Sequence, residues 1–144
     1  PMIRLADTNV VFAILVGHHG HHTRAWRWWE RRDEASVGLC LPVRLGTLRL
    51  LTNATAMEGG PVSPEEALAA WDSFADDPRT VGLPPPGGPH ELHFRRLIRG
   101  RATTPNLWTD AWLAAFAEST GMGLTSFDAG FRSFGLKDFE LLRG

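Results

Sequence analysis

The feature that most constrains the fold is a short, mostly apolar segment, residues 2–6, which ends at Asp7. Five residues are too few for a helix, and such a run is typical of a strand buried in a parallel sheet. Residues 123–127 repeat the pattern and run into Asp128. Ligands of open α/β sheets bind just beyond the carboxyl ends of the strands. The sequence therefore predicts that Asp7 and Asp128 lie together at one sheet edge.

Short candidate strands alternate with candidate helices along the whole chain. Further strands are predicted at residues 36–41, 80–83 and 138–142, and helices at 10–16, 23–32, 42–51, 64–77, 90–99 and 107–120. This alternation predicts an α/β fold with a parallel or mostly parallel sheet and helices on both faces. At 144 residues, the chain is expected to form a single domain over residues 1–144.

Several helices carry specific expectations. Ser63, Pro64 and Glu66 form the clearest helix start, with Ser63 as N-cap and Glu66 completing a capping box. Spacing of three and four residues predicts which apolar side chains face the core. These are Ala25, Trp26 and Trp29 in the second helix, Val43, Leu45, Leu48, Leu50 and Leu51 in the third, and Ala67, Leu68, Trp71 and Phe74 in the fourth.

Composition excludes some classes of protein. The net charge of −1 argues against a passive nucleic-acid-binding module, although not against an enzyme that meets phosphates at a local site. The single cysteine, Cys40, cannot form an internal disulfide, and the chain is expected to be cytoplasmic. No segment has the length of a membrane span or the basic leader of a signal peptide.

A third acid joins the pair at the strand ends. Asp110 lies in the first turn of the helix at 107–120, which leads through Gly121 into the strand before Asp128. Three gathered carboxylates repel each other, and a divalent cation such as Mg²⁺ or Mn²⁺ removes that cost. Such an ion also activates water and stabilises charge on a phosphodiester. Each acid has a simpler explanation alone: Asp7 as a helix cap, Asp110 as a favourable charge at a helix start, and Asp128 as a turn residue.

The ordered motifs identify the chain as similar to a known family. They are residues 5–10 (LADTNV), His21 and His22 with Ala25 and Trp29, residues 45–53 (LGTLRLLTN), 109–114 (TDAWLA) and 124–128 (LTSFD). Together they resemble a PIN-domain ribonuclease of the kind that serves as the toxin in VapBC toxin–antitoxin pairs. The motifs span nearly the whole chain.

The resemblance implies a sheet of strand order 3-2-1-4-5 and RNA hydrolysis that depends on Mg²⁺ or Mn²⁺. It also implies a homodimer and a cognate antitoxin that blocks the active site. Asp7, Asp110 and Asp128 would then be the catalytic and metal-binding residues. Asn9 and Ser126 would be polar neighbours of the acids, and Thr8 and Asn9 would position the substrate.

One position departs from the family's pattern. The family usually places a Glu, or in this branch a Gln, early in the middle helix, and counting back from Arg49 puts that position at Arg44. Arg44 is expected to pair with Asp7 or Asp110; the alternatives are contact with an RNA phosphate and a solvated arginine on an exposed helix face. Two alternatives therefore stay open: a nuclease acting on single-stranded or flap DNA, and a non-catalytic PIN-like module.

The apolar content of residues 43–51 and 67–74 is high for helices that face only one core. Part of this surface is therefore expected to lie in a dimer or antitoxin interface.

Overall fold

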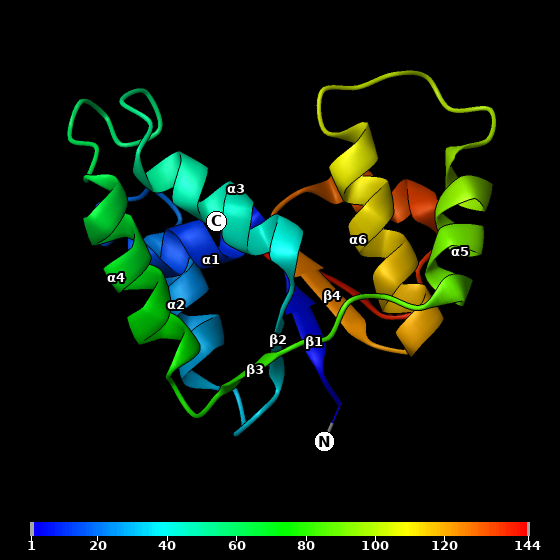
Figure 1. The fold of residues 1–144 in the computed structure, drawn as a ribbon, viewed down its shortest axis with the longest axis horizontal. Coiled ribbons are helices and arrows are strands. Elements are labelled where there is room, and N and C mark those ends of the chain that lie inside the picture. Colours follow the sequence, from blue (N-terminus) through cyan, green and yellow to red (C-terminus); the bar gives the residue numbers. More distant parts are fainter. Residues whose placement is uncertain (1, 144) are drawn as a thin grey trace.

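Five parallel strands form the centre of the molecule in a computed structural model that describes residues 2–143. Their order is β3-β2-β1-β4-β5, so β1 is central (Figure 1). The bounds are Arg4–Ala6 for β1, Val37–Leu39 for β2, Thr80–Gly82 for β3, Gly123–Ser126 for β4 and Phe139–Leu141 for β5. Every pairing is parallel, which confirms the predicted sheet and its strand order.

The register of the sheet aligns the strand ends that carry the candidate acids. Leu5 of β1 lies between Gly38 of β2 and Leu124 of β4. Beyond the paired residues, the amide of Asp7 donates to the carbonyl of Thr125 at 2.9 Å. Asp7 and the residues that follow β4 therefore meet at the same edge, as the sequence predicts.

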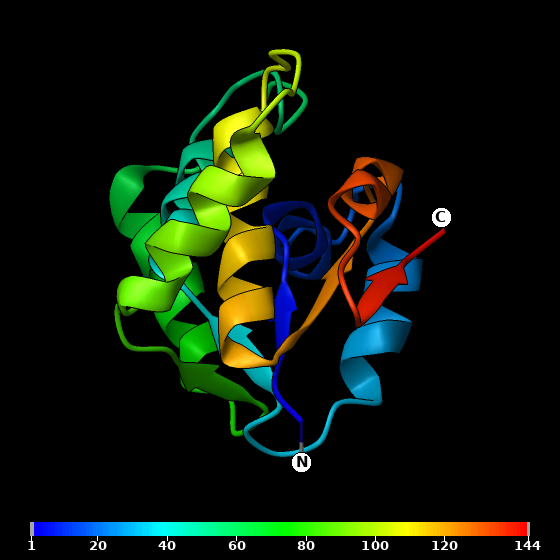
Figure 2. The same ribbon diagram turned by 90° about the vertical axis from the view of Figure 1, so that its right-hand side faces the viewer.

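Helices cover both faces of this sheet, and α2 and α6 lie on opposite sides of the strands (Figure 2). Their bounds are Thr8–Leu15 for α1, His22–Glu30 for α2, Leu41–Leu51 for α3, Pro64–Ala75 for α4, Gly88–Ile98 for α5 and Leu107–Thr120 for α6. A 3₁₀ segment, η1 (Ala129–Phe134), joins β4 to β5. Helix α1 packs on α2 and α3, while α5 packs on α6. In residues 2–143, no helix combines the length and apolar character needed to cross a membrane.

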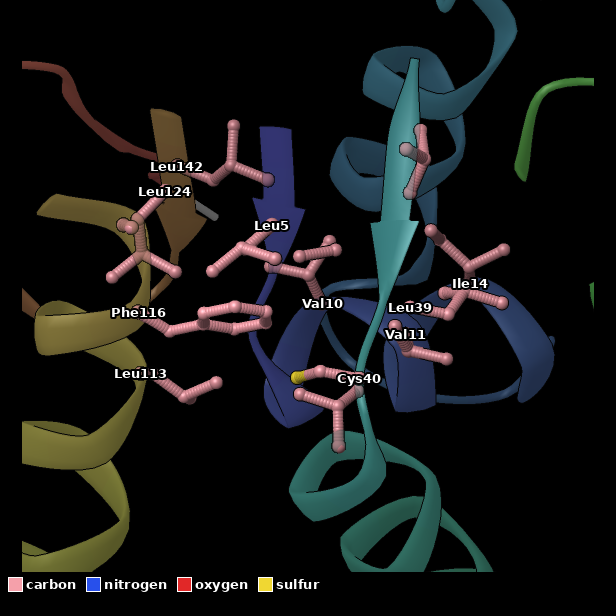
Figure 3. Close-up of a cluster of buried hydrophobic side chains, with 14 of the residues drawn as sticks. Leu5, Val10, Val11, Ile14, Leu39, Cys40, Leu113, Phe116, Leu124 and Leu142 are labelled. Atoms are coloured by element: carbon pink, nitrogen blue, oxygen red, sulfur yellow. The ribbon is translucent and has the colours of Figure 1, made fainter. Parts of the chain in front are cut away.

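The core fills the space between the central strands and the helices (Figure 3). Leu5 and Leu124 from the strands are fully buried, as are Val10 of α1 and Leu113 of α6. Burial of this kind is the main favourable term in folding, at roughly 1.5–3 kcal/mol for each large apolar side chain. The core therefore fixes the two helices whose first turns carry functional side chains.

Two predicted helix boundaries depend on specific residues. Ser63 accepts from the amide of Glu66, whose carboxylate accepts in return from the amide of Ser63, so the capping box is confirmed. Gly121 ends α6 with φ of 74°, a left-handed conformation that favours glycine. The turn after α6 thus leads directly into β4.

Three predicted core positions are wrong. Trp26 is 41% exposed, and Trp28 is buried in its place, where its indole N–H donates to Glu140 at 2.8 Å. Leu45 and Leu68 are 56% and 42% exposed. These helices carry apolar residues around much of their circumference, so spacing alone does not distinguish the inner face from the outer one.

Candidate active site

Three carboxylates line one cavity of about 540 Å³ beyond the carboxyl ends of β1 and β4. Asp7 follows β1 and caps α1, Asp110 lies in the first turn of α6, and Asp128 follows β4 and caps η1. Residues of α3 and α6 both line the cavity, and Figure 1 shows these two helices on either side of the ends of β1 and β4. The structure thus brings together all three of the predicted acids.

Ser126 organises the inner part of the cavity. Its hydroxyl, fully buried, donates to Asp7 Oδ2 at 2.7 Å. Ser126 Oγ also accepts from the side-chain amide of Asn9 at 3.1 Å and from the backbone amide of Asp128 at 2.9 Å. Asn9 Oδ1 in turn accepts from the amide of Phe127 at 3.2 Å. These bonds fix Asp7 and Asp128 relative to each other.

Asp7 is also the helix cap that its position suggests. Its Oδ1 accepts from the amide of Thr8 at 2.7 Å. Burial raises the pKa of Asp7, an effect that the bonds from Ser126 and Thr8 partly offset and that the charge of Asp128 increases. A cap needs no burial, so this environment indicates more than a structural role.

Asp110 is a second acid of the site whose pKa is raised. Burial raises its pKa to about 7, and the negative charges of Asp7 and Asp128 add to this effect. Strongly raised carboxyl pKa values in a cleft are typical of functional sites. The three groups therefore hold less negative charge at neutral pH than three free acids would.

The chemistry of the donors fits a hard divalent cation. The acids supply carboxylate oxygens, the ligands that Mg²⁺ and Mn²⁺ prefer, and a cation would relieve the repulsion that raises the pKa of Asp110. Within residues 2–143, however, no three acidic, histidine or cysteine side chains converge closely enough to form a complete metal site. Mg²⁺ typically uses one or two carboxylates with water and substrate phosphate, so the fit does not require such convergence.

The arginine that lines this cavity is Arg49, not Arg44. Pro42, Leu45, Gly46 and Arg49 are spaced as one face of α3, and all four line the cavity. Arg44 is exposed and does not line it. The predicted pairing of Arg44 with Asp7 or Asp110 is wrong, because none of the salt bridges in residues 2–143 involves Arg44.

Helical geometry explains this correction. Arg44 precedes Gly46 by two residues, which is about 200° of rotation around a helix of 3.6 residues per turn. Gly46 approaches Thr8 so closely that an added Cβ would stand 2.9 Å from Thr8 Oγ1. The α3 residue that lies against the predicted substrate-positioning Thr8 is therefore one without a side chain.

Sequence reasoning missed three polar residues that line the cavity, namely Arg49, Asn106 and Thr109. Thr109 and Asn106 precede Asp110 closely in the sequence. Arg49 follows Pro42 by about two helical turns, and this spacing indicates that both residues lie on one face of the helix. The predicted Thr8 and Asn9 also line the cavity, whereas Ser126 lies behind it and contacts Asp7.

Comparison with known proteins gives concordant matches. The PIN domain family matches residues 4–136. Ribonuclease VapC41 of Mycobacterium tuberculosis is 35% identical, over 96% of this chain and 97% of its own length. Ribonuclease VapC31 of the same organism is 30% identical, over 90% and 92%.

Solved structures share the fold. Mycobacterium tuberculosis VapC20, a sarcin-ricin loop cleaving toxin, matches with a TM-score of 0.66 and 19% identity over 92% of this chain and 95% of its own. VapBC2 from Rickettsia felis, bound to a DNA fragment from their promoter, matches with a TM-score of 0.67 and 13% identity over 99% and 100%. At these identities the likeness concerns the fold alone.

Proposed function

The chain belongs to the PIN-domain family, and from that premise we propose that it is a VapC-type toxin that hydrolyses RNA with a divalent cation. The observation that carries the proposal is the cavity in which Asp7, Asp110 and Asp128 meet. Its acids occur in the motifs by which the sequence resembles this family, and the relatives with at least 30% identity are ribonucleases by name. The metal is proposed to be Mg²⁺ or Mn²⁺ because the donors are oxygens.

The acids would hold the cation, which when bound neutralises charge on the phosphodiester and lowers the pKa of water. The chain's own residues have distinct tasks. Ser126 holds the Asp7 carboxylate in one orientation through its 2.7 Å bond, so Asp7 does not need to change rotamer when the substrate binds. In the metal-free protein burial raises the pKa of Asp110 to about 7, and binding of the cation would require its ionised form. Thr8 and Asn9 line the cavity where the substrate phosphate would enter.

The main test is incubation of purified protein with RNA in Mn²⁺ or Mg²⁺, with single-stranded DNA in parallel. We expect internal cleavage of RNA that EDTA abolishes. Absence of cleavage with either metal would favour a non-catalytic module, and equal cleavage of DNA would favour the broader nuclease. The main support for a non-catalytic module was an Arg44 that replaces the cation, and Arg44 is exposed instead.

Arg49 and Arg44 provide a matched pair of variants on one helix. We expect Arg49→Gln to lower kcat/KM for RNA by about ten- to hundredfold, because a charged hydrogen bond to phosphate contributes roughly 1.5–3 kcal/mol. Arg44→Gln removes the same charge outside the cavity and should change kcat/KM less than about twofold. Steady-state kinetics on one RNA checks both. A larger loss from Arg44→Gln would indicate that Arg44 contacts the substrate or the acids after all.

The proposed partners are a cognate antitoxin and a second copy of the chain. Leu41 and Leu45 of α3 and Leu68 of α4 are 61%, 56% and 42% exposed. Leu41 and Leu45 are one helical turn apart, and exposed leucines on these two helices favour an interface. We expect light scattering to report a dimer, and a monomer at every accessible concentration would contradict the homodimer.

A further inference from the structure

A second cavity adjoins the first on the other side of the acids. It has a volume of about 650 Å³ and shares Asn106, Asp110 and Asp128 with the first cavity. Each of the two volumes is in the range of small-molecule sites, roughly 300–1,000 Å³. The two cavities thus form one path that crosses Asp110 and Asp128.

Each half of this path contains one arginine. Arg49 lines the first cavity and Arg101 lines the second. The acids between them carry negative charge, so a polyanion that enters the path meets positive charge on both sides of the acids. The chain has a net charge of −1, so these local cations are not part of a general basic surface.

Arg101 is held firmly in its place. Its Nη1 donates to Ser133 Oγ and its Nη2 to the carbonyl of Ser133, both at 2.9 Å. Its Nε donates to the carbonyl of Leu97. The guanidinium also covers the ring of Phe134, with 4.2 Å from Cζ to the ring centroid. A guanidinium ordered in this way loses little freedom when it binds a ligand.

Arg101 nevertheless keeps binding capacity. A guanidinium has five N–H donors, and these contacts use three of them. No carboxylate in residues 2–143 forms a salt bridge with Arg101, so the protein leaves its charge uncompensated. One N–H group on Nη1, one on Nη2 and the positive charge beside the cavity remain able to attract and bind a phosphate oxygen.

We propose that Arg101 binds a backbone phosphate of the substrate RNA, on the opposite side of the cleaved bond from Arg49. This rests on the proposed function, and it adds an extended substrate: an unpaired strand with nucleotides on both sides of the acids. The site then selects internal phosphodiesters over chain ends. An unpaired strand can lay one phosphate after another along such a path.

A purely structural role is the competing explanation. Arg101 anchors Ser133 of η1, and Asp128 caps η1, so loss of the arginine could displace that acid. The charge of Arg101 and its anchoring bonds can be separated. Ser133→Ala removes the Oγ acceptor and leaves the charge, whereas Arg101→Gln removes the charge.

The test uses an RNA oligonucleotide that the wild-type protein cleaves at one bond. Its phosphates are replaced one at a time by neutral methylphosphonates, and kcat/KM is measured with Mn²⁺ over a range of salt concentrations. For the wild type, we expect one replacement away from the cleaved bond to reduce kcat/KM about tenfold. In Arg101→Gln, which itself loses about tenfold, that replacement should have almost no further effect. Its dependence of log kcat/KM on log salt should be shallower by about 0.7, the value for one phosphate contact on a single strand.

Two controls accompany this cycle. Ser133→Ala should retain the wild-type sensitivity to the methylphosphonate, and Arg95→Gln, an exposed arginine of α5 outside both cavities, should retain the wild-type salt dependence. If Arg101→Gln loses rate while every methylphosphonate still has its wild-type effect, Arg101 is only an anchor and the proposal is wrong. If the wild-type protein cleaves no RNA, the proposed function itself fails.

Discussion

Asp7→Asn, Asp110→Asn and Asp128→Asn are each expected to reduce RNA cleavage by about a thousandfold. The acids are proposed to hold the ion that stabilises the transition state, a contribution of several kcal/mol, and about 1.4 kcal/mol corresponds to tenfold in rate. The fold should persist in each variant, because asparagine has the shape of aspartate. In metal-free Asp110→Asn the melting temperature should remain or rise, since repulsion among the acids is relieved, whereas Asp7→Asn also loses one of the two bonds that Asp7 accepts. Cleavage assays and thermal melts check the two parts.

The matched control is Asp72→Asn, which changes the same chemical group at an exposed position on α4 away from the cavity. It should cleave RNA at the wild-type rate. Wild-type cleavage by Asp7→Asn, in protein purified free of other nucleases, would remove the acids from the mechanism. A lowered melting temperature in all three variants would instead indicate that the acids serve the fold.

The arrangement of strands was predictable from local signals. A short apolar run followed by Asp occurs twice, at Asp7 and Asp128, and parallel pairing then places both at one edge. Asp110 could be placed there because α6 has a clear end at Gly121 and leads straight into β4. These inferences depend on chain direction and element length, which a sequence shows well.

The face that α3 turns to the cavity was not predictable in the same way. Leu41, Leu45 and Leu48 are as apolar as Val43 and Leu51, yet only the last two are buried. When apolar residues surround a helix, its periodicity no longer indicates one inner face, and the contacts of neighbouring elements decide the rotation. The assignment of Arg44 to the site depended on that rotation.

Arg101 shows a second limit of sequence analysis. It lies between α5 and α6, and nothing nearby in the chain marks it as part of a site. Its partner Ser133 is 32 residues away, and only the packing of η1 against that loop brings them together. Functional groups supplied by loops depend on such distant contacts, whereas the acids at strand ends depend on the sheet alone.

Metal affinity is expected to rise steeply with pH in the range where Asp110 loses its proton. The carboxyl has a pKa of about 7 in the folded, metal-free protein, and a cation binds its ionised form. Well below that value, each unit of pH should raise the apparent affinity for Mn²⁺ about tenfold through Asp110, so its share of the gain from about pH 5 to 7 is roughly fiftyfold, and the raised pKa of Asp7 adds to it. Above about pH 7 the affinity should level off. Calorimetric titration with Mn²⁺ at several pH values measures this dependence.

The proton on Asp110 also affects the stability of the metal-free protein. Stability should fall as pH rises, whereas metal affinity should increase. The folded pKa lies above the ordinary value of 3.8, so the folded state holds the proton between about pH 4 and 7 while the unfolded state has lost it. Stability from this group is therefore present below about pH 4 and is lost as pH rises through 7. In Asp110→Asn, both the fall in melting temperature and the tenfold steps in Mn²⁺ affinity should be reduced relative to wild type. Mn²⁺ affinity that is equal at pH 5 and 7 in the wild type would exclude Asp110 as a group that must ionise for metal to bind.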